Sequence, residues 1–475
     1  MNEKLAEALG YVDGKYVAAA ARRKKHKKKI LFPLIAAVLA LVLLINTPTI
    51  PFVVTARAVA MPGNSRAPQW HGDGDYRNSH ENYESYRILA INNAETVTAA
   101  NQDFAAFFAD ASHEFLTGTE ENALWSPVNA AVALSILAET ADGSTRQEIL
   151  DLLGVEDVET LREYIARIWE AGNETDGNQI RAMASSLWLD NGMNYDRSVM
   201  DTLAHDYYVS VYQGNLGGVL TNNAIQTWVS NQTGGFLNQM SNGIDLTPSP
   251  KSIGTVMALV STVYLKGTWL DEFSESQNTD GIFHSPGGDK TVTYMNRDKI
   301  QTYYYWGESC GAVYLHMRNG TCMWLILPDE DKTTADVLAE GEYLSMIGAQ
   351  YLEEYENRKY MKVNLSMPKF DISKELDLVE GLKSMGITEA FDENGGEFRD
   401  TFDTELPIFI DKITQASRVS VDEQGVTAGA YIELMWGAGA MAPPEEIIDF
   451  VLDRPFVFAI TTEGIPMFVG VVNEP

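Results

Sequence analysis

The stretch that decides the fold is RVSVDEQGVTAGAYIELMWGAGAMAPPEEIIDFVLDRPFVF, residues 418–458. It opens with one strand-like run, RVSVDE (418–423), and closes with another, FVF. Between these runs the sequence has no helical period and no hairpin turn, and its middle is rich in Gly and Ala. A loop of this length inside a folded domain is typical of a functional segment.

The first part of this loop nonetheless alternates like a β-strand. One face would carry Val426, Ala428, Ala430, Ile432 and Leu434, and the other Thr427, Gly429, Tyr431, Glu433 and Met435. The pattern predicts a segment able to become a strand, with mostly small or aliphatic residues on its inward side. The residues alone also allow an edge strand followed by a disordered tip.

Around this loop, the chain from about residue 97 is first helical and then strand-like. A helical face carries Phe104, Phe107, Phe108, Ala111 and Phe115, and Ser126-Pro127 begins a second helix that ends near Asp142. The later strand-like runs are TVMALVSTVYLKGTW (255–269), AVYLHM (312–317), CMWLILP (322–328), MKVNLSMPKF (361–370), RVSVDE (418–423), FVFAIT (456–461) and MFVGVV (467–472). This order predicts an α+β fold with large antiparallel sheets.

The two cysteines, Cys310 and Cys322, flank a predicted hairpin that turns at Asn319-Gly320. In that register Cys322 lies opposite Met317, and Cys310 lies roughly 20 Å away at the rise of a strand. A disulfide needs Cα atoms within about 7 Å. We therefore predict that the two cysteines do not form a disulfide.

Charge and motifs exclude several classes of function. The formal net charge of -31 divides into +7 for residues 1–60 and -38 for the remainder, and so acidic a body argues against binding nucleic acid. The sequence contains no G-x-S-x-G, HExxH, Walker or GxGxxG motif, and its seven histidines show no ligand-like spacing. We predict a protein that is not an enzyme and that needs no metal and no cofactor.

The N-terminal region predicts a membrane segment. The basic block RRKKHKKK (22–29) precedes sixteen uncharged, mostly apolar residues (30–45), which NTPTIPFVV (46–54) extends. Sixteen helical residues span about 24 Å of a hydrocarbon core roughly 30 Å thick, and a basic flank stays in the cytoplasm. We predict a cytoplasmic segment at 1–29, a signal anchor at 30–54 and an extracytoplasmic linker at 55–96. The alternative is a signal peptide cleaved after Ala58-Val59-Ala60, which would release the body as a secreted protein.

Several motifs of the body resemble the serpin family, in the order that the family has them, from about residue 97 to the C-terminus. They are NALWSP (122–127), VYLKGTW (263–269), Phe283-His284 with Met295, LILPDE (325–330), MPKF (367–370), LKSMGITEAF (382–391), VDEQGVTAGA (421–430), DRPFVFAI (453–460) and IPMFVGVVNEP (465–475). The resemblance implies a serpin domain at 97–475 with three β-sheets, eight or nine helices and an exposed reactive-centre loop. It also implies suicide-substrate inhibition, in which a protease cuts the loop, forms an acyl-enzyme and is trapped when the loop inserts into the main sheet.

The resemblance also assigns roles to residues. The hinge of the loop is Glu423, Gly425, Val426, Thr427, Ala428, Gly429 and Ala430. The upper end of the main sheet is called the breach, and the resemblance places Trp269 there. The centre of the sheet is called the shutter, and the resemblance places Ser126, Ser261 and Gln415 there. Val426 replaces the usual Thr or Ser of the hinge, and Ser261 and Gln415 replace an Asn and a His of the shutter.

Counting about seventeen positions from Glu423, as the family does, gives Gly439 as the residue before the scissile bond. Ala440, one position further, suits the small apolar pocket of an elastase- or subtilisin-like protease better. We predict cleavage at Ala440–Met441, with Gly439–Ala440 second. Trypsin-like proteases should fail, because no Lys or Arg lies between Arg418 and Arg454.

Together these features predict a monomeric, membrane-anchored serpin of bacterial type that inhibits extracellular serine proteases. The alternative is a non-inhibitory serpin, a binding or structural surface protein whose loop never inserts.

Overall fold

The structure is a computed structural model. It describes residues 56–62, 95–175, 180–233, 257–318, 320–348, 355–392, 396–399, 401–403, 408–410, 413–426 and 444–475. The predicted anchor, most of the predicted linker and the middle of the loop lie outside these residues. Among the helices that the structure describes, none is both long enough and apolar enough to cross a membrane.

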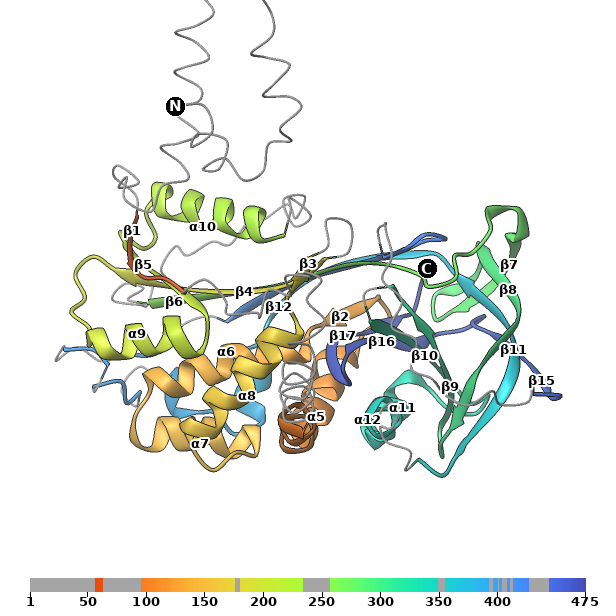
Figure 1. The fold of residues 1–475 in the computed structure, drawn as a ribbon, viewed down its shortest axis with the longest axis horizontal. Coiled ribbons are helices and arrows are strands. Elements are labelled where there is room, and N and C mark those ends of the chain that lie inside the picture. The colour runs from red at the N-terminus through yellow and green to blue at the C-terminus, as the bar shows by residue number, and fades with distance from the viewer. Residues whose placement is uncertain are drawn as a thin grey trace, which may run out of the picture. The chain divides into compact units, whose positions relative to one another are not determined.

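The main sheet runs through the domain between two layers of helices (Figure 1). Its strands, in order, are β1 (Ala56–Ala60), β5 (Val209–Gly214), β4 (Ile180–Asp190), β6 (Met257–Thr268) and β14 (Gly425–Val426), with β3 (Glu174–Thr175) paired to β4. β4 and β5 are parallel, and the other pairs are antiparallel. β12 (Phe370–Asp377) and β13 (Thr414–Val421) pair with each other, and β13 lies next to β6. Within the described residues no ladder joins β6 to β13, so the sheet is divided at this point.

The strands of the other two sheets are joined in one continuous series of paired strands. The first part contains β7 (Thr279–Ser285), β8 (Gly288–Trp306), β11 (Arg358–Pro368) and β15 (Ile447–Val451). The second contains β9 (Cys310–His316), β10 (Thr321–Pro328), β16 (Phe456–Thr462), β17 (Ile465–Val472) and β2 (Ala123–Trp125). The end of β8 joins the two parts by pairing with Gly311 and Ala312 of β9. The predicted α+β class with large, mainly antiparallel sheets is therefore confirmed.

The first half of the chain supplies most of the helices. These are α5 (Ala105–Leu116), α6 (Pro127–Thr140), α7 (Gly143–Leu153), α8 (Val158–Ala171) and α9 (Arg197–Asp206) on one side of the main sheet, and α10 (Val219–Gln232) on the other (Figure 1). The later helices α11 (Thr334–Glu340), α12 (Glu342–Gly348) and α13 (Val379–Ser384) are short. The predicted helix start at Ser126-Pro127 is confirmed: Ser126 caps α6 and Pro127 occupies its first turn.

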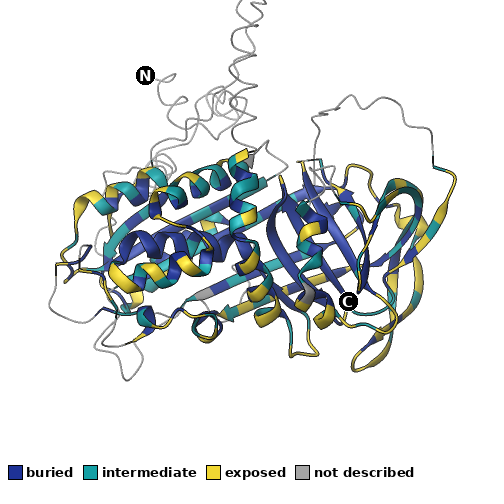
Figure 2. Cartoon of the chain, turned by 90° about the horizontal axis from the view of Figure 1, so that it is seen from below, coloured by how far each residue is buried: buried dark blue, intermediate teal, exposed yellow. Residues whose placement is uncertain are grey.

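The helices differ in how much of their surface is buried. α6 is buried along nearly its whole length, as its apolar composition on every side requires, while α8 buries the single stripe Val158, Leu161, Ile165 and Ile168. In Figure 2 buried residues follow the inner faces of the helices and the sheets, and exposed residues lie on the outer faces. A smaller apolar cluster beneath α10 includes Trp188, Ile225 and Trp228.

Two sequence predictions need correction. Cys322 pairs with His316 and not with Met317, because the connection between the two strands is one residue longer than predicted. Cys310 pairs with Pro328. Both cysteines are buried, and the described structure contains no disulfide between them, as predicted. The segment predicted as a linker from residue 55 contains β1, whose Val59 and Ala60 are buried against the edge of the main sheet.

Candidate functional site

The loop begins at a tight turn after β13. Asp422 accepts the backbone N–H of Gln424 at 2.8 Å and that of Gly425 at 3.2 Å on its Oδ1, while its own N–H donates to the Gly425 carbonyl at 3.1 Å. This Asx-type turn reverses the chain, and the next two residues form β14. Gly425 pairs with Thr268 and Val426 with Gly267, so the loop sets out antiparallel along β6.

Gly425 is required at this turn by both conformation and space. Its φ is +133°, which side chains rarely adopt, and a Cβ atom would lie 2.4 Å from the Gly267 carbonyl oxygen and 2.6 Å from the Thr268 Cα. Neither backbone atom can move away without breaking the pairing of β14 with β6. The predicted hinge glycine is therefore the residue that lets the loop approach the sheet.

Trp269 holds the turn at the upper end of β6. Its side chain is fully buried, and its indole N–H donates to the Asp422 carbonyl at 2.9 Å. Its backbone N–H donates to the Gln424 carbonyl at 3.1 Å, and the N–H of Phe273 donates to the Glu423 carbonyl at 3.0 Å. The residue assigned to the breach thus contacts the hinge directly.

Glu423 provides the charged contact of the hinge. Its side chain is nearly buried and forms an ion pair with Lys369 at 2.5 Å, and Asn278 donates to the same oxygen at 2.5 Å. Burial raises the pKa of the Glu423 carboxyl, but the hydrogen bonds from Lys369, Asn278 and the backbone outweigh it, so that the pKa lies below its usual value. The carboxylate is therefore ionised at neutral pH and fixes the hinge to the start of β12.

At the centre of the sheet, Ser126 and Gln415 join α6 to β13. Gln415 Oε1 accepts the backbone N–H of Ser126 at 2.7 Å, and Gln415 Nε2 donates to the Ser126 carbonyl at 2.9 Å. Ser126 Oγ donates to the Met467 carbonyl of β17 at 2.6 Å. Both side chains are buried, so these bonds are shielded from water.

Ser261 belongs to a second group of contacts, which joins α6 to β6 and β4. Its hydroxyl donates to Asn129 Oδ1 and lies 2.9 Å from the hydroxyl of Ser185, and Asn129 Nδ2 donates to the Ser261 carbonyl at 3.4 Å. Sequence reasoning missed Asn129 and Ser185. The sequence offered one signal for Asn129, its position three residues after the cap Ser126. In the structure its backbone N–H donates to the Ser126 hydroxyl at 3.3 Å.

Comparison with known families matches residues 99–475 to the family described as serpin (serine protease inhibitor), beginning two residues after the predicted start of the domain. The chain belongs to the serpin family. Serpin-ZX of Arabidopsis thaliana is 26% identical over 381 residues, which are 77% of this chain and 95% of that protein.

Solved serpin structures share the fold. The native state of the thermophilic serpin tengpin superposes with a TM-score of 0.67 at 24% identity, covering 78% of this chain and 93% of tengpin. Human thyroxine-binding globulin, solved in complex with thyroxine, gives a TM-score of 0.65 at 20% identity, covering 80% of this chain and 99% of that one. Serpins are generally protease inhibitors and not catalysts, while the name of the globulin shows that the fold also serves binding.

The rest of the predicted site of this serpin lies outside the described residues. This applies to the hinge residues Thr427, Ala428, Gly429 and Ala430 and to the bait residues Gly439, Ala440 and Met441. The structure describes the chain again from Pro444, which leads into β15. Sequence reasoning missed this strand, which pairs in parallel with β11 and follows an ion pair between Glu446 and Lys359 at 2.6 Å.

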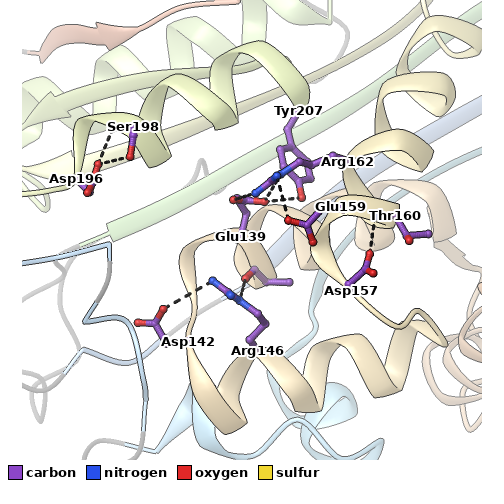
Figure 3. Close-up of polar contacts among 11 residues, drawn as sticks. Glu139, Asp142, Arg146, Asp157, Glu159, Thr160, Arg162, Asp196, Ser198 and Tyr207 are labelled. Carbon is purple, nitrogen blue, oxygen red and sulfur yellow. Dashed lines mark hydrogen bonds and ion pairs between the residues drawn. The ribbon is translucent and has the colours of Figure 1, made fainter.

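At the end of α6 opposite Ser126, the serpin holds a partly buried ion pair (Figure 3). Arg162 of α8 donates to both carboxylate oxygens of Glu139 on α6, at 2.9 Å and 2.7 Å, and the Tyr207 hydroxyl donates to the same carboxylate at 3.0 Å. The bond to Glu139 raises the pKa of Arg162, and burial raises the pKa of Tyr207. These contacts connect α6, α8 and the end of α9, and so hold the helix that carries Ser126 and Asn129.

Proposed function

We propose that this serpin is a suicide-substrate inhibitor of extracellular serine proteases, whose cleaved loop inserts between β6 and β13. The observation that supports this most strongly is β14. Its two residues pair antiparallel with the upper end of β6, so the loop already points along the edge where a further strand would lie. β13 lies next to β6, and within the described residues no ladder joins the two strands, so the inserted strand would lie between neighbours that are not paired there.

Continuing the register of β14 predicts the surroundings of each inserted residue. Because Val426 pairs with Gly267, Ala428 would lie opposite Leu265 and Ala430 opposite Val263. Leu265 and Val263 are both buried in the main core. The small side chains of the loop would therefore face the core, as their alternation in the sequence predicts.

The same register gives the energy available for trapping. Residues 427–436 would lie opposite 266–257, and about 1 kcal/mol for each net hydrogen bond releases on the order of 10 kcal/mol. This is comparable with the whole stability of an ordinary domain, about 5–15 kcal/mol. The uninserted form is then held kinetically, and the shutter contacts of Ser126 and Asn129, which bind α6 to both sides of the opening, contribute to the barrier.

The proposed targets are elastase- or subtilisin-like proteases, which accept Ala440 at a small apolar pocket. Trypsin-like proteases would find no Lys or Arg between Arg418 and Arg454. Mass spectrometry of the released C-terminal peptide identifies the bond. An N-terminus at Met441 supports the assignment, one at Ala440 supports the second choice, and one at Trp436 or earlier contradicts it.

We also propose that residues 30–54 anchor the serpin in a membrane, with its body on the extracytoplasmic side. The proposal rests on the basic block at 22–29 and the uncharged stretch that follows it. A cleaved signal peptide would require Ala60 to be reached by a peptidase before β1 pairs with β5 and buries it. Flotation of the full chain with lipid vesicles tests the anchor separately from inhibition.

The test of inhibition is direct. The full chain, in detergent, is incubated with an elastase-like protease and run on a denaturing gel; a portion of the same protease, its nucleophilic serine blocked beforehand, is the control. Inhibition gives a covalent complex with the active protease alone. Complete cleavage of the loop with full recovery of protease activity would instead establish the non-inhibitory alternative.

A further inference from the structure

One stretch of this acidic domain carries no charged residue in its sequence. From residue 207 to residue 244 there is no Asp, Glu, Lys, Arg or His, although charged residues make up 21% of the chain. The described part of this stretch includes β5 and the whole of α10. α10 covers the main sheet on the side opposite α6 and α9 (Figure 1).

The first turn of α10 exposes two aliphatic side chains. Val219 is 74% exposed, the largest fraction among the large hydrophobic residues that the structure describes, and its neighbour Leu220 is 52% exposed. The next residue of the helix, Thr221, is buried, and Ile225 and Trp228 pack on the sheet. The exposed pair therefore points away from the domain.

The same end of the sheet receives the chain from the predicted anchor. Ala56, two residues after the end of that segment at Val54, pairs with Gly214, the last residue of β5. Gly214 is five residues before Val219, which limits their separation to about 18 Å. The exposed pair thus lies near the point at which the anchor would leave the membrane.

We propose that Val219 and Leu220 contact the lipid surface in which the anchor is held. The proposal rests on the proposed anchor. A body of net charge -38 is repelled by anionic lipid headgroups, and α10, which has no charged side chain, can approach them at a lower cost than the acidic elements. Aliphatic side chains beside it gain by leaving water for the headgroup boundary.

This contact also sets the distance of the hinge from the membrane. Ala56, Gly214 and Met257 lie at one end of the sheet, whereas Thr268, which pairs with Gly425 of the hinge, lies at the other. The length of β6, roughly 36 Å for twelve residues, separates the two ends. The contact therefore holds the hinge at Gly425 at the end of the sheet that is farther from the membrane.

The test uses the full chain in vesicles of phosphatidylcholine and phosphatidylglycerol. Leu220→Cys carries an environment-sensitive fluorophore, and Ile447→Cys, on β15, is the matched control because Ile447 is 51% exposed. The native Cys310 and Cys322 are buried, so labelling of the unsubstituted chain measures the background. Brominated phosphatidylcholine quenches a fluorophore within the bilayer boundary, and iodide quenches one in water.

We expect the label at residue 220 to lose most of its emission to brominated lipid and the label at residue 447 to lose it to iodide. If the chain floats with the vesicles but the label at 220 responds to iodide alone, the anchor stands and the lipid contact is refuted. Protection of that label from both quenchers would show that another protein segment or a second copy covers it, which also refutes the contact. A chain that fails to float removes the anchor and the contact together.

Discussion

Ala428→Arg should convert this serpin from an inhibitor into a substrate. An arginine in a loop that has not inserted would be solvated and would cost almost nothing. After insertion, the register of β14 puts residue 428 opposite Leu265, a buried residue of the main core that is 6% exposed. The guanidinium would then lie on the core side of the sheet without a partner charge.

The penalty falls on the inserted state alone. Burying an unpaired guanidinium costs several kcal/mol, here taken as about 3 kcal/mol. If insertion carries this cost in full, its rate falls by about two orders of magnitude. Deacylation is unchanged, because the scissile bond is distant from the substitution. The acyl-enzyme is then hydrolysed before it is trapped.

The assay measures the number of serpin molecules consumed for each protease molecule inhibited, together with the covalent complex on a denaturing gel. Thr427→Arg is the control, because its side chain would face the other side of the sheet opposite Lys266. The two cations would repel each other by less than about 1 kcal/mol, so this variant should remain an inhibitor. Equal loss of complex in both variants, or in neither, would refute the proposed register and the insertion built on it.

Three further variants test the hinge and the helices behind the sheet. Gly425→Ala should lower the free energy of unfolding by at least about 2 kcal/mol more than the control Gly288→Ala does. Gly288 has a similar φ of +117°, but a Cβ atom there would meet open space. Denaturant unfolding measures both variants, and equal losses would show that the close backbone contact at Gly425 is unimportant. Arg162→Met should cost about 1–3 kcal/mol, since it removes the hydrogen bonds of the guanidinium from the buried Glu139 carboxylate, and an unchanged stability would contradict this. The Glu423 carboxyl has a lowered pKa in the folded state, so its stabilising contact is complete above its unfolded pKa of about 4.3 and is lost as the pH falls through the folded value. Lys369→Met should therefore destabilise the protein most at pH 7, and its effect should shrink as the pH is lowered through the acid range; a pH-independent difference would assign the effect to packing.

The fold could be predicted from the sequence because its signals are local and numerous. The cap at Ser126 and the apolar runs of β16 and β17 each specify a short element, and the order of such motifs along the chain identified the family. Trp269 and the hinge were predicted by resemblance, and the structure brings them into contact.

The missed features depend on contacts between distant segments. β15 has few buried residues and two exposed aliphatic ones, Ile447 and Val451, so its pattern differs little from that of a loop; pairing with β11 makes it a strand. β1 is short and precedes a polar stretch, so nothing local distinguishes it from a linker. Asn129 and Ser185 are recognised as part of the shutter by their distances to Ser261, which the sequence does not contain.

The change in thermal stability on loop cleavage tests the central claim most directly. A protease that cuts within residues 436–442 without being trapped leaves a loop free to insert, and the melting temperature is then compared with that of the uncut chain. Insertion worth on the order of 10 kcal/mol should raise the melting temperature of a domain of this size by about 12 °C. A cut chain that melts at the same temperature as the intact one, or below it, would show that the loop does not enter the sheet.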